Sequence, residues 1–190
     1  MSTRRALLIG INGYQHFTDL QGCENDVRDL LRLLETRYEF THCRTLLTTE
    51  ATGAGMRAAL QQLVDDTQTG DVVVFFFAGH GSQLRDEDGD EPSGFDNTLV
   101  PHDSCHDAAR PELNLDIVDD ELRGYLEQLT AKTEAVTVIV DACHSGTITR
   151  GASSALVTGV RGLPPYLGPR PTRSAAPVVA RTRSASTPYV

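Results

Sequence analysis

Two short segments of this chain carry a cysteine and a histidine in positions suited to thiol chemistry. Residues 79–82 read Gly-His-Gly-Ser and contain His80, and residues 141–146 read Asp-Ala-Cys-His-Ser-Gly and contain Cys143. A free thiol has a pKa of about 8.5, so a neighbouring imidazole is needed to raise its thiolate fraction at neutral pH. The pair predicts a nucleophilic Cys143 with His80 as its general acid and base, rather than a small buried cysteine and an unrelated loop histidine.

Each of these segments follows a run of apolar residues typical of a buried strand. The runs are residues 72–76 (Val-Val-Val-Phe-Phe) and residues 136–140 (Val-Thr-Val-Ile-Val). In an open parallel sheet, ligands bind outside the carboxyl ends of the strands. If these two strands are neighbours, His80 and Cys143 face each other at that edge. The backbone N–H groups of Gly81 and Cys143 are then candidates for an oxyanion hole, in which each donor contributes roughly 3 kcal/mol.

The elements that must position this pair alternate between strands and helices. Continuously apolar strands suit a parallel sheet, and the helical segments show apolar residues at helical spacing. The pattern predicts an α/β fold with a mostly parallel sheet covered on both faces. It predicts strands over residues 6–11, 44–47, 72–76 and 136–140, and helices over residues 27–35, 56–66 and 122–129. Residues 84–115 look long, polar and irregular, with only residues 98–100 strand-like.

The charge divides the chain into two parts. The net charge is −9, and all 26 acidic residues precede residue 151, whereas residues 151–190 contain five Arg and no acid. We therefore expect one domain over residues 1–150 and a flexible Pro/Ser/Ala/Arg-rich tail or linker over residues 151–190. An acidic body argues against nucleic acid as a partner.

No apolar run is long enough for a membrane span, and the four Cys match no disulfide or zinc framework. We therefore expect a cytoplasmic protein with reduced thiols and no membrane partner.

Taken together, these motifs resemble the caspase-fold cysteine peptidases and, among them, the metacaspases and their bacterial orthocaspase-type relatives. The resemblance spans roughly residues 4–149 and includes residues 8–12 (Leu-Ile-Gly-Ile-Asn) and 22–27 (Gly-Cys-Glu-Asn-Asp-Val). It implies the large, p20-like part of a three-layer αβα sandwich with about four strands in the order 2-1-3-4. It also implies a cysteine-type endopeptidase in which Cys143 is the nucleophile and His80 the general acid and base.

The resemblance also implies cleavage after Arg or Lys of peptide or protein substrates. Asp26 and Asp141 match the family positions that line a pocket for a basic side chain, and carboxylates bind guanidinium groups through short, charge-assisted bonds. Each residue has a structural alternative. Asp26 suits the first turn of a helix, where a negative charge is stabilising. Asp141 suits a structural hydrogen bond.

Calcium is a candidate activator because many metacaspases need it. The acids that match the family ligands are Asp96, Asp119 and Asp120, whereas a further ligand position falls on Arg150, which would repel the ion. Asp119 has a competing interpretation as a helix N-cap. The acidic run over residues 86–91 is interpreted as a solvated turn, since it does not match an EF-hand loop. No other cofactor is expected.

The small p10-like part that normally completes the caspase sheet is not apparent in residues 151–190. The chain is then a fragment, is completed by a p10-like segment or second chain, or works in a reduced or inactive form. The alternative function is a caspase-like scaffold or regulatory domain, and a metal site of Cys143, His144, His80 and Cys23 is a weaker hypothesis because the spacing does not support it. Self-cleavage in the tail is a further hypothesis, with candidate sites at Arg150, Arg161, Arg170 and Arg173.

Overall fold

The central sheet consists of four parallel strands. The computed structural model describes residues 2–142 and 162–171 of the 190-residue chain. The strands are β1 (Arg4–Gly10), β2 (His42–Leu47), β3 (Val72–Ala78) and β7 (Ala135–Asp141), in the order β2-β1-β3-β7. This arrangement confirms the predicted α/β fold and the predicted order of its strands.

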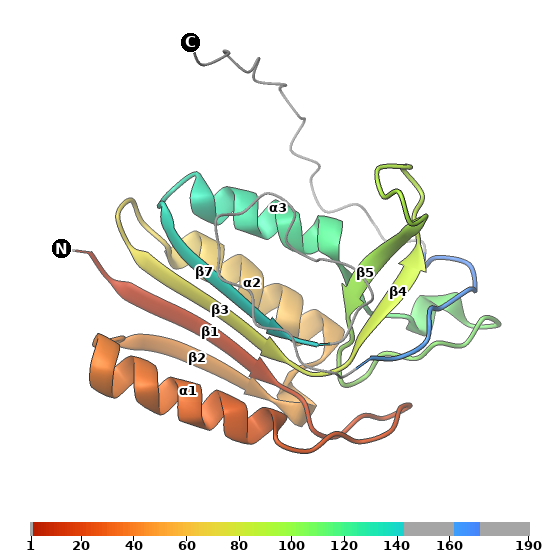
Figure 1. The fold of residues 1–190 in the computed structure, drawn as a ribbon, viewed down its shortest axis with the longest axis horizontal. Coiled ribbons are helices and arrows are strands. Elements are labelled where there is room, and N and C mark those ends of the chain that lie inside the picture. The colour runs from red at the N-terminus through yellow and green to blue at the C-terminus, as the bar shows by residue number, and fades with distance from the viewer. Residues whose placement is uncertain (1, 143–161, 172–190) are drawn as a thin grey trace, which may run out of the picture.

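Helices cover both faces of the sheet and give the molecule three layers (Figure 1). Helix α1 (Cys23–Tyr38) lies on one face, and α2 (Gly53–Asp66) and α3 (Asp119–Thr130) lie on the other. Short 3-10 turns, η1 (Thr48–Glu50) and η2 (Pro111–Leu113), occur in the connections. Within the described ranges, none of the helices combines the length and the apolar content that crossing a membrane requires.

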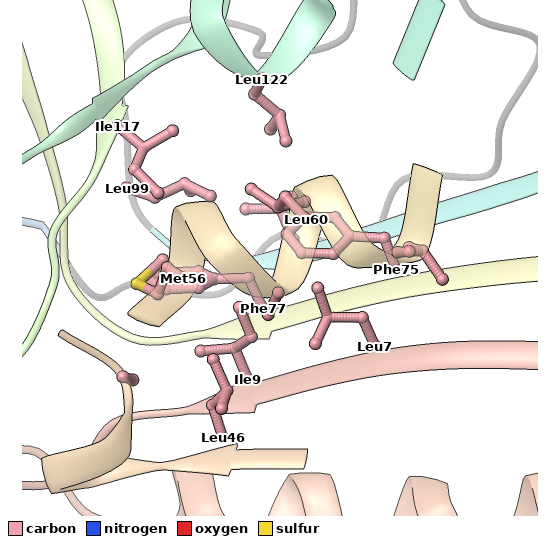
Figure 2. Packing of buried hydrophobic residues seen from close by; sticks show 14 of the residues in the cluster. Leu7, Ile9, Leu46, Met56, Leu60, Phe75, Phe77, Leu99, Ile117 and Leu122 are labelled. Atoms are coloured by element: carbon pink, nitrogen blue, oxygen red, sulfur yellow. The ribbon is translucent and has the colours of Figure 1, made fainter. Parts of the chain in front are cut away.

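The core is built on both sides of β3, whose sequence is Val-Val-Val-Phe-Phe-Phe-Ala. Because side chains alternate along a strand, Phe75 and Phe77 pack with α2 and α3, whereas Phe76 and Ala78 pack with α1. Figure 2 shows the larger cluster, in which Phe75 and Phe77 lie against the side chains of α2. A one-residue slip of β3 would therefore exchange the side chains that pack in the two clusters and disrupt the packing of both.

Side-chain capping and local charge stabilise the N-termini of α2 and α3. Thr52 caps α2, because its hydroxyl accepts a hydrogen bond of 3.0 Å from the N–H of Gly55. Helix α3 has Val118 at its N-cap without a side-chain cap bond, and Asp119 is its first helical residue. The interpretation of Asp119 as an N-cap is therefore wrong. Its carboxylate instead belongs to a first turn with three acidic residues, where the helix dipole favours negative charge.

A second, antiparallel sheet occupies part of the region expected to be irregular. It consists of β4 (Gly81–Arg85), β5 (Phe95–Leu99) and β6 (Ile117–Val118), in the order β4-β5-β6. The expectation of an irregular segment over residues 84–115 is wrong for the last two residues of β4 and for residues 95–97 of β5. Both strands are polar and short, and they are stabilised by pairing with each other rather than by an apolar pattern visible in either one.

Residues 162–171, which fall within the expected tail, run alongside β4 (Figure 1). Isolated parallel bridges join Gly81 to Gly162 and Leu84 to Tyr166. The backbone groups at the outer edge of β4 therefore find hydrogen-bond partners in this segment, which protects an edge that would otherwise be open to other chains. The described part of the expected tail is thus packed against the domain.

We expect Gly10→Ala to destabilise the fold by roughly 1–3 kcal/mol, because a Cβ at Gly10 would lie 2.6 Å from the carbonyl oxygen of Cys23 and 2.7 Å from Cγ2 of Val27. Gly124→Ala in α3 is the control, since a Cβ there meets no heavy atom within 4 Å. That change should stabilise the protein by about 0.5–1 kcal/mol. Urea unfolding measures both, and equal stability of Gly10→Ala and the parent would contradict the close packing of α1 on β1.

Candidate active site

The carboxyl ends of β3 and β7 lie side by side at one edge of the sheet. The two strands pair in parallel, and Ala78 is the register partner of Asp141 at their last residues. The N–H of Gly79 donates a 3.3 Å hydrogen bond to the carbonyl oxygen of Asp141, so the pairing continues just past the strand. His80 follows Ala78 by two residues, and Cys143 follows Asp141 by two residues in the sequence.

His80 is buried at this edge, and contacts of its ring and its backbone hold it in place. The residue is only 5% exposed, and its ring packs on Tyr14 with a centroid separation of 4.7 Å. Its backbone N–H donates a 2.7 Å hydrogen bond to the hydroxyl of Tyr14. Its Nε2 lies 2.8 Å from the carbonyl oxygen of Thr18. Because a carbonyl oxygen can only accept, this contact places a proton on Nε2 and makes Nδ1 the basic nitrogen of the neutral ring.

The loop between β1 and α1 supplies both of these partners. The N–H of Gln15 donates to the carbonyl oxygen of His102, and Nδ1 of His102 lies 2.7 Å from the carbonyl oxygen of Gly13. The N–H of Tyr14 donates to the carboxylate of Asp19 at 3.0 Å. These bonds tie the loop to itself and to the segment after β5, so the carbonyl group that orients His80 has a fixed position.

Tyr14 and Thr18 are site residues that the sequence reasoning missed. The available signal was their place directly after the first strand, which the fold sets beside β3. That position indicates proximity to the active-site edge, but it does not identify a tyrosine ring or a backbone carbonyl group as the partner of His80. Only the path of the loop decides this.

The structure places the two candidate specificity residues at the same edge and on the same face. Asp141 ends β7 opposite Ala78, and alternation along β7 puts it on the face of Ile139, which packs in the cluster covered by α1. Asp26 lies in the first turn of α1, as its structural alternative predicted. Both carboxylates are half-buried. The stabilising role of Asp26 at the helix N-terminus does not prevent it from also facing a substrate.

Gly81, the candidate oxyanion-hole donor, begins β4 and pairs with Leu99. Its carbonyl oxygen accepts a 2.8 Å hydrogen bond from the N–H of Leu163, which fixes the peptide plane that follows Gly81. The role of the Gly81 N–H as an oxyanion donor stays a prediction.

Cys143, His144 and Arg150 lie outside the described residues. Cys23 is buried in the cluster beneath α1, as expected for a packing residue.

Acidic residues gather in a second place, around the loop that joins β4 to β5. Carboxylate oxygens of Asp86, Asp90 and Asp96 lie within 4.8 Å of one another, and so do those of Asp88, Asp90 and Asp120. The three predicted calcium ligands are thus divided in the described structure: Asp96 and Asp120 fall in different groups that share Asp90, and Asp119 falls in neither. The loop interpreted as a solvated turn contributes to both groups.

Two buried carboxylates in this region have oxygen atoms suited to a hard cation. Asp96 is 1% exposed and Asp119 is 5% exposed, and Oδ1 of each has no hydrogen-bond partner among the described residues. Burial, with further charge from Asp120, raises the pKa of Asp119 to about 6. Buried carboxylate oxygens without donors are costly unless a cation neutralises them, and calcium binds oxygen ligands of this kind. The group of Asp86, Asp90 and Asp96 therefore offers the kind of oxygen ligands that calcium binds.

Two arginine side chains already neutralise part of this charge. Arg123 of α3 forms ion pairs with Asp120 and Asp90. Arg170, from the segment that lies along β4, forms an ion pair with Asp96. Asp86 is stabilised in its charged form: its carboxylate accepts hydrogen bonds from the N–H groups of Gly89, Glu91 and Asp88, which lower its pKa.

Comparisons with known proteins agree with this fold and site. The family described as "Metacaspase, peptidase C14 domain" matches residues 4–150. Metacaspase-1 of Eremothecium gossypii is 36% identical over 151 residues, covering 75% of this chain and 32% of that protein. Metacaspase-4 of Arabidopsis thaliana is 38% identical over 152 residues, covering 76% of this chain and 34% of that protein. A crystal structure of a Geobacter sulfurreducens protein superposes with a TM-score of 0.60 at 29% identity, covering 77% of this chain and 52% of that one.

The chain belongs to the metacaspase family of C14 peptidases. This finding confirms the resemblance drawn from the motifs, and the parallel sheet with its helical layers agrees with a caspase-like fold. The chain spans about a third of the length of these curated relatives.

We expect Tyr14→Phe to lower the free energy of unfolding by about 1–3 kcal/mol, because it removes the acceptor for a buried backbone N–H at His80. Tyr38→Phe is the control, since Tyr38 is 55% exposed and should change stability by less than about 0.5 kcal/mol. Urea denaturation of the three proteins tests this expectation. Equal stability of Tyr14→Phe and the parent would show that the N–H of His80 finds another partner.

Proposed function

We propose that this chain is the catalytic part of a cysteine endopeptidase that cleaves peptide bonds after Arg or Lys. The observation that carries the proposal is the register of β3 and β7, in which Ala78 is paired with Asp141. His80 and Cys143 each follow this pair by two residues, and neighbouring strands are about 4.8 Å apart. Membership of a peptidase family supports protein substrates.

The orientation of His80 supports its role as general acid and base. With Nε2 bonded to the carbonyl oxygen of Thr18, Nδ1 is the nitrogen that accepts the proton of the Cys143 thiol. The thiolate attacks the substrate carbonyl carbon, and the N–H groups of Gly81 and Cys143 stabilise the oxyanion. The imidazolium then donates its proton to the leaving amine, which leaves a thioester. A water molecule deprotonated by Nδ1 hydrolyses the thioester and releases the carboxylic acid and the thiol.

The preference for a basic residue rests on Asp26 and Asp141. Asp26 lies in the first turn of α1, and Asp141 ends β7 on the face that α1 covers, which supports a pocket in which both carboxylates bind a guanidinium or ammonium group of the substrate. An acidic substrate side chain at this place would meet like charge instead. Asp141 directly precedes the segment that carries Cys143, so a cation bound there lies close to the reacting bond.

Calcium is proposed as an activator that binds the acidic groups around the β4–β5 loop. The buried oxygen atoms of Asp96 and Asp119 support this assignment. When bound, the ion would supply positive charge that neutralises these carboxylates, and it would order the loop between the two strands. It takes no part in the proton transfers between His80 and Cys143.

We expect the full chain to hydrolyse short fluorogenic peptides that end in Arg, to leave peptides that end in Asp uncut, and to lose activity in Cys143→Ala. The reason is that the thiolate is the nucleophile and the pocket is acidic. The assay is run with calcium chloride and with a chelator. Turnover that survives in Cys143→Ala would contradict the proposed nucleophile, and no turnover in either condition would favour a caspase-like scaffold or regulatory domain.

We expect Asp141→Asn to lower kcat/KM for an Arg peptide by about 30-fold or more, because a bound guanidinium loses a partner and such losses amount to about 2 kcal/mol or more. Asp29→Asn is the charge-matched control, since Asp29 lies on α1 with its side chain 76% exposed. It should change kcat/KM by less than about twofold. If Asp141→Asn retains the preference for Arg over a neutral residue, Asp141 has a structural role and the pocket lies elsewhere.

A further inference from the structure

Residues 162–171, which we call the strap, run along the outer edge of β4. The N–H of Leu163 donates to the carbonyl oxygen of Gly81, and the N–H of Tyr166 donates to the carbonyl oxygen of Gln83, both at 2.8 Å. The strap contains prolines at positions 164, 165, 169 and 171, which have no N–H to donate. The backbone of the strap therefore offers few donors, and side chains must provide much of its attachment.

Tyr166 anchors the middle of the strap. The residue is 5% exposed, its hydroxyl donates to the carbonyl oxygen of Asp107 at 3.2 Å, and its ring lies 5.2 Å from the ring of His106. Leu163 packs against the main core cluster. By contrast, Leu167 is 63% exposed, so its side chain makes little apolar contact with the domain.

Arg170 attaches the C-terminal end of the strap to the group of carboxylates formed by Asp86, Asp90 and Asp96. Its Nε donates a 2.9 Å hydrogen bond to the carbonyl oxygen of Arg85, and its guanidinium forms an ion pair with Asp96. Asp96 is 1% exposed, its Oδ1 has no hydrogen-bond partner among the described residues, and it shares a group of close carboxylates with Asp86 and Asp90. The strap thus ends with a cation placed where a metal ion would bind.

We propose that Arg170 is a tethered competitor of calcium for the group of Asp86, Asp90 and Asp96, and that calcium binding displaces Arg170 and releases the end of the strap. Arg170 pairs with Oδ2 of Asp96, and Oδ1 of the same carboxylate is the oxygen left for a metal ion. A calcium ion on that carboxylate would lie close to the guanidinium group, where the two positive charges repel each other, so each cation weakens the binding of the other. The coupling between the Arg170–Asp96 ion pair and calcium binding is reciprocal, so a substitution that weakens the ion pair should raise the affinity for calcium.

Release of the strap would affect the candidate active site through Gly81, whose carbonyl oxygen bonds to the strap. The strap bonds to the carbonyl oxygen of Gly81 at one end and, through Arg170, to the carbonyl oxygen of Arg85 and to Asp96 at the other. Gly81 and Arg85 are the first and last residues of β4, and Asp96 lies on β5 as the register partner of Leu84. Calcium would then free the peptide group between Gly81 and Ser82, one residue beyond His80, from its partner. This consequence rests on the proposed function, whereas the competition between Arg170 and calcium does not.

The test uses the full chain with Cys143→Ala, which prevents self-cleavage, so the result does not depend on peptidase activity. Calcium chloride is titrated calorimetrically into this parent, Arg170→Ala, Arg170→Lys and Arg32→Ala. Arg32 pairs with Asp29 on the exposed face of α1, so Arg32→Ala controls for the loss of one positive charge. We expect at least about fivefold tighter calcium binding in Arg170→Ala, the lower end of usual coupling between ligands. Arg170→Lys should fall between Arg170→Ala and the parent, and Arg32→Ala should match the parent.

Hydrogen exchange gives a second readout on the same proteins. Calcium should speed the exchange of the Leu163 and Tyr166 amides in the parent, and a chelator should reverse this effect. In Arg170→Ala these amides should already exchange faster without calcium. The proposal is overturned if neither protein binds calcium, if Arg170→Ala binds it within about twofold of the parent, or if calcium leaves both amides unchanged.

Discussion

The parallel pairing of β3 with β1 and β7 is the constraint on which the site depends. Strand β3 is apolar on both faces, so helices must cover it from both sides and its backbone must pair along both edges. Its register is fixed by aromatic side chains that alternate between two packed clusters. Because the register is fixed, the last residues of β3 and β7 lie side by side, and this sets the position of the backbone at His80.

Orientation of the imidazole is a separate matter from its position. The loop after β1 crosses the edge of the sheet and presents a hydroxyl and a carbonyl oxygen to the backbone and ring of His80. These groups act through hydrogen bonds that satisfy the N–H groups of the histidine while it is buried. One tautomer is selected as a result, and the basic nitrogen that thiol chemistry requires is on the other side of the ring from the Thr18 carbonyl group.

Charge is balanced differently at the two ends of β4. Near Gly81 the proposed mechanism needs hydrogen-bond donors for a developing oxyanion, whereas beside the other end of β4 the carboxylates of Asp96 and Asp119 are buried. Guanidinium groups of Arg123 and Arg170 supply part of the positive charge that these acidic residues need. Strand β4 thus runs from the candidate active site to a group of acidic residues whose charge different cations can balance.

The sequence by itself determined the main strands, the helical layers and the placement of His80 at a strand end, because continuous apolar strands and periodic helices are local signals. The order of the strands came from the resemblance of the motifs to the caspase fold, since local signals do not contain it. Only the tertiary structure decided the small sheet, the partners of His80, the division of the acidic groups and the docking of Arg170. Polar strands such as β4 and β5 gain their stability from each other, and residues 162–171 gain theirs from β4. Pairings between segments far apart in the chain leave no periodic trace in either segment.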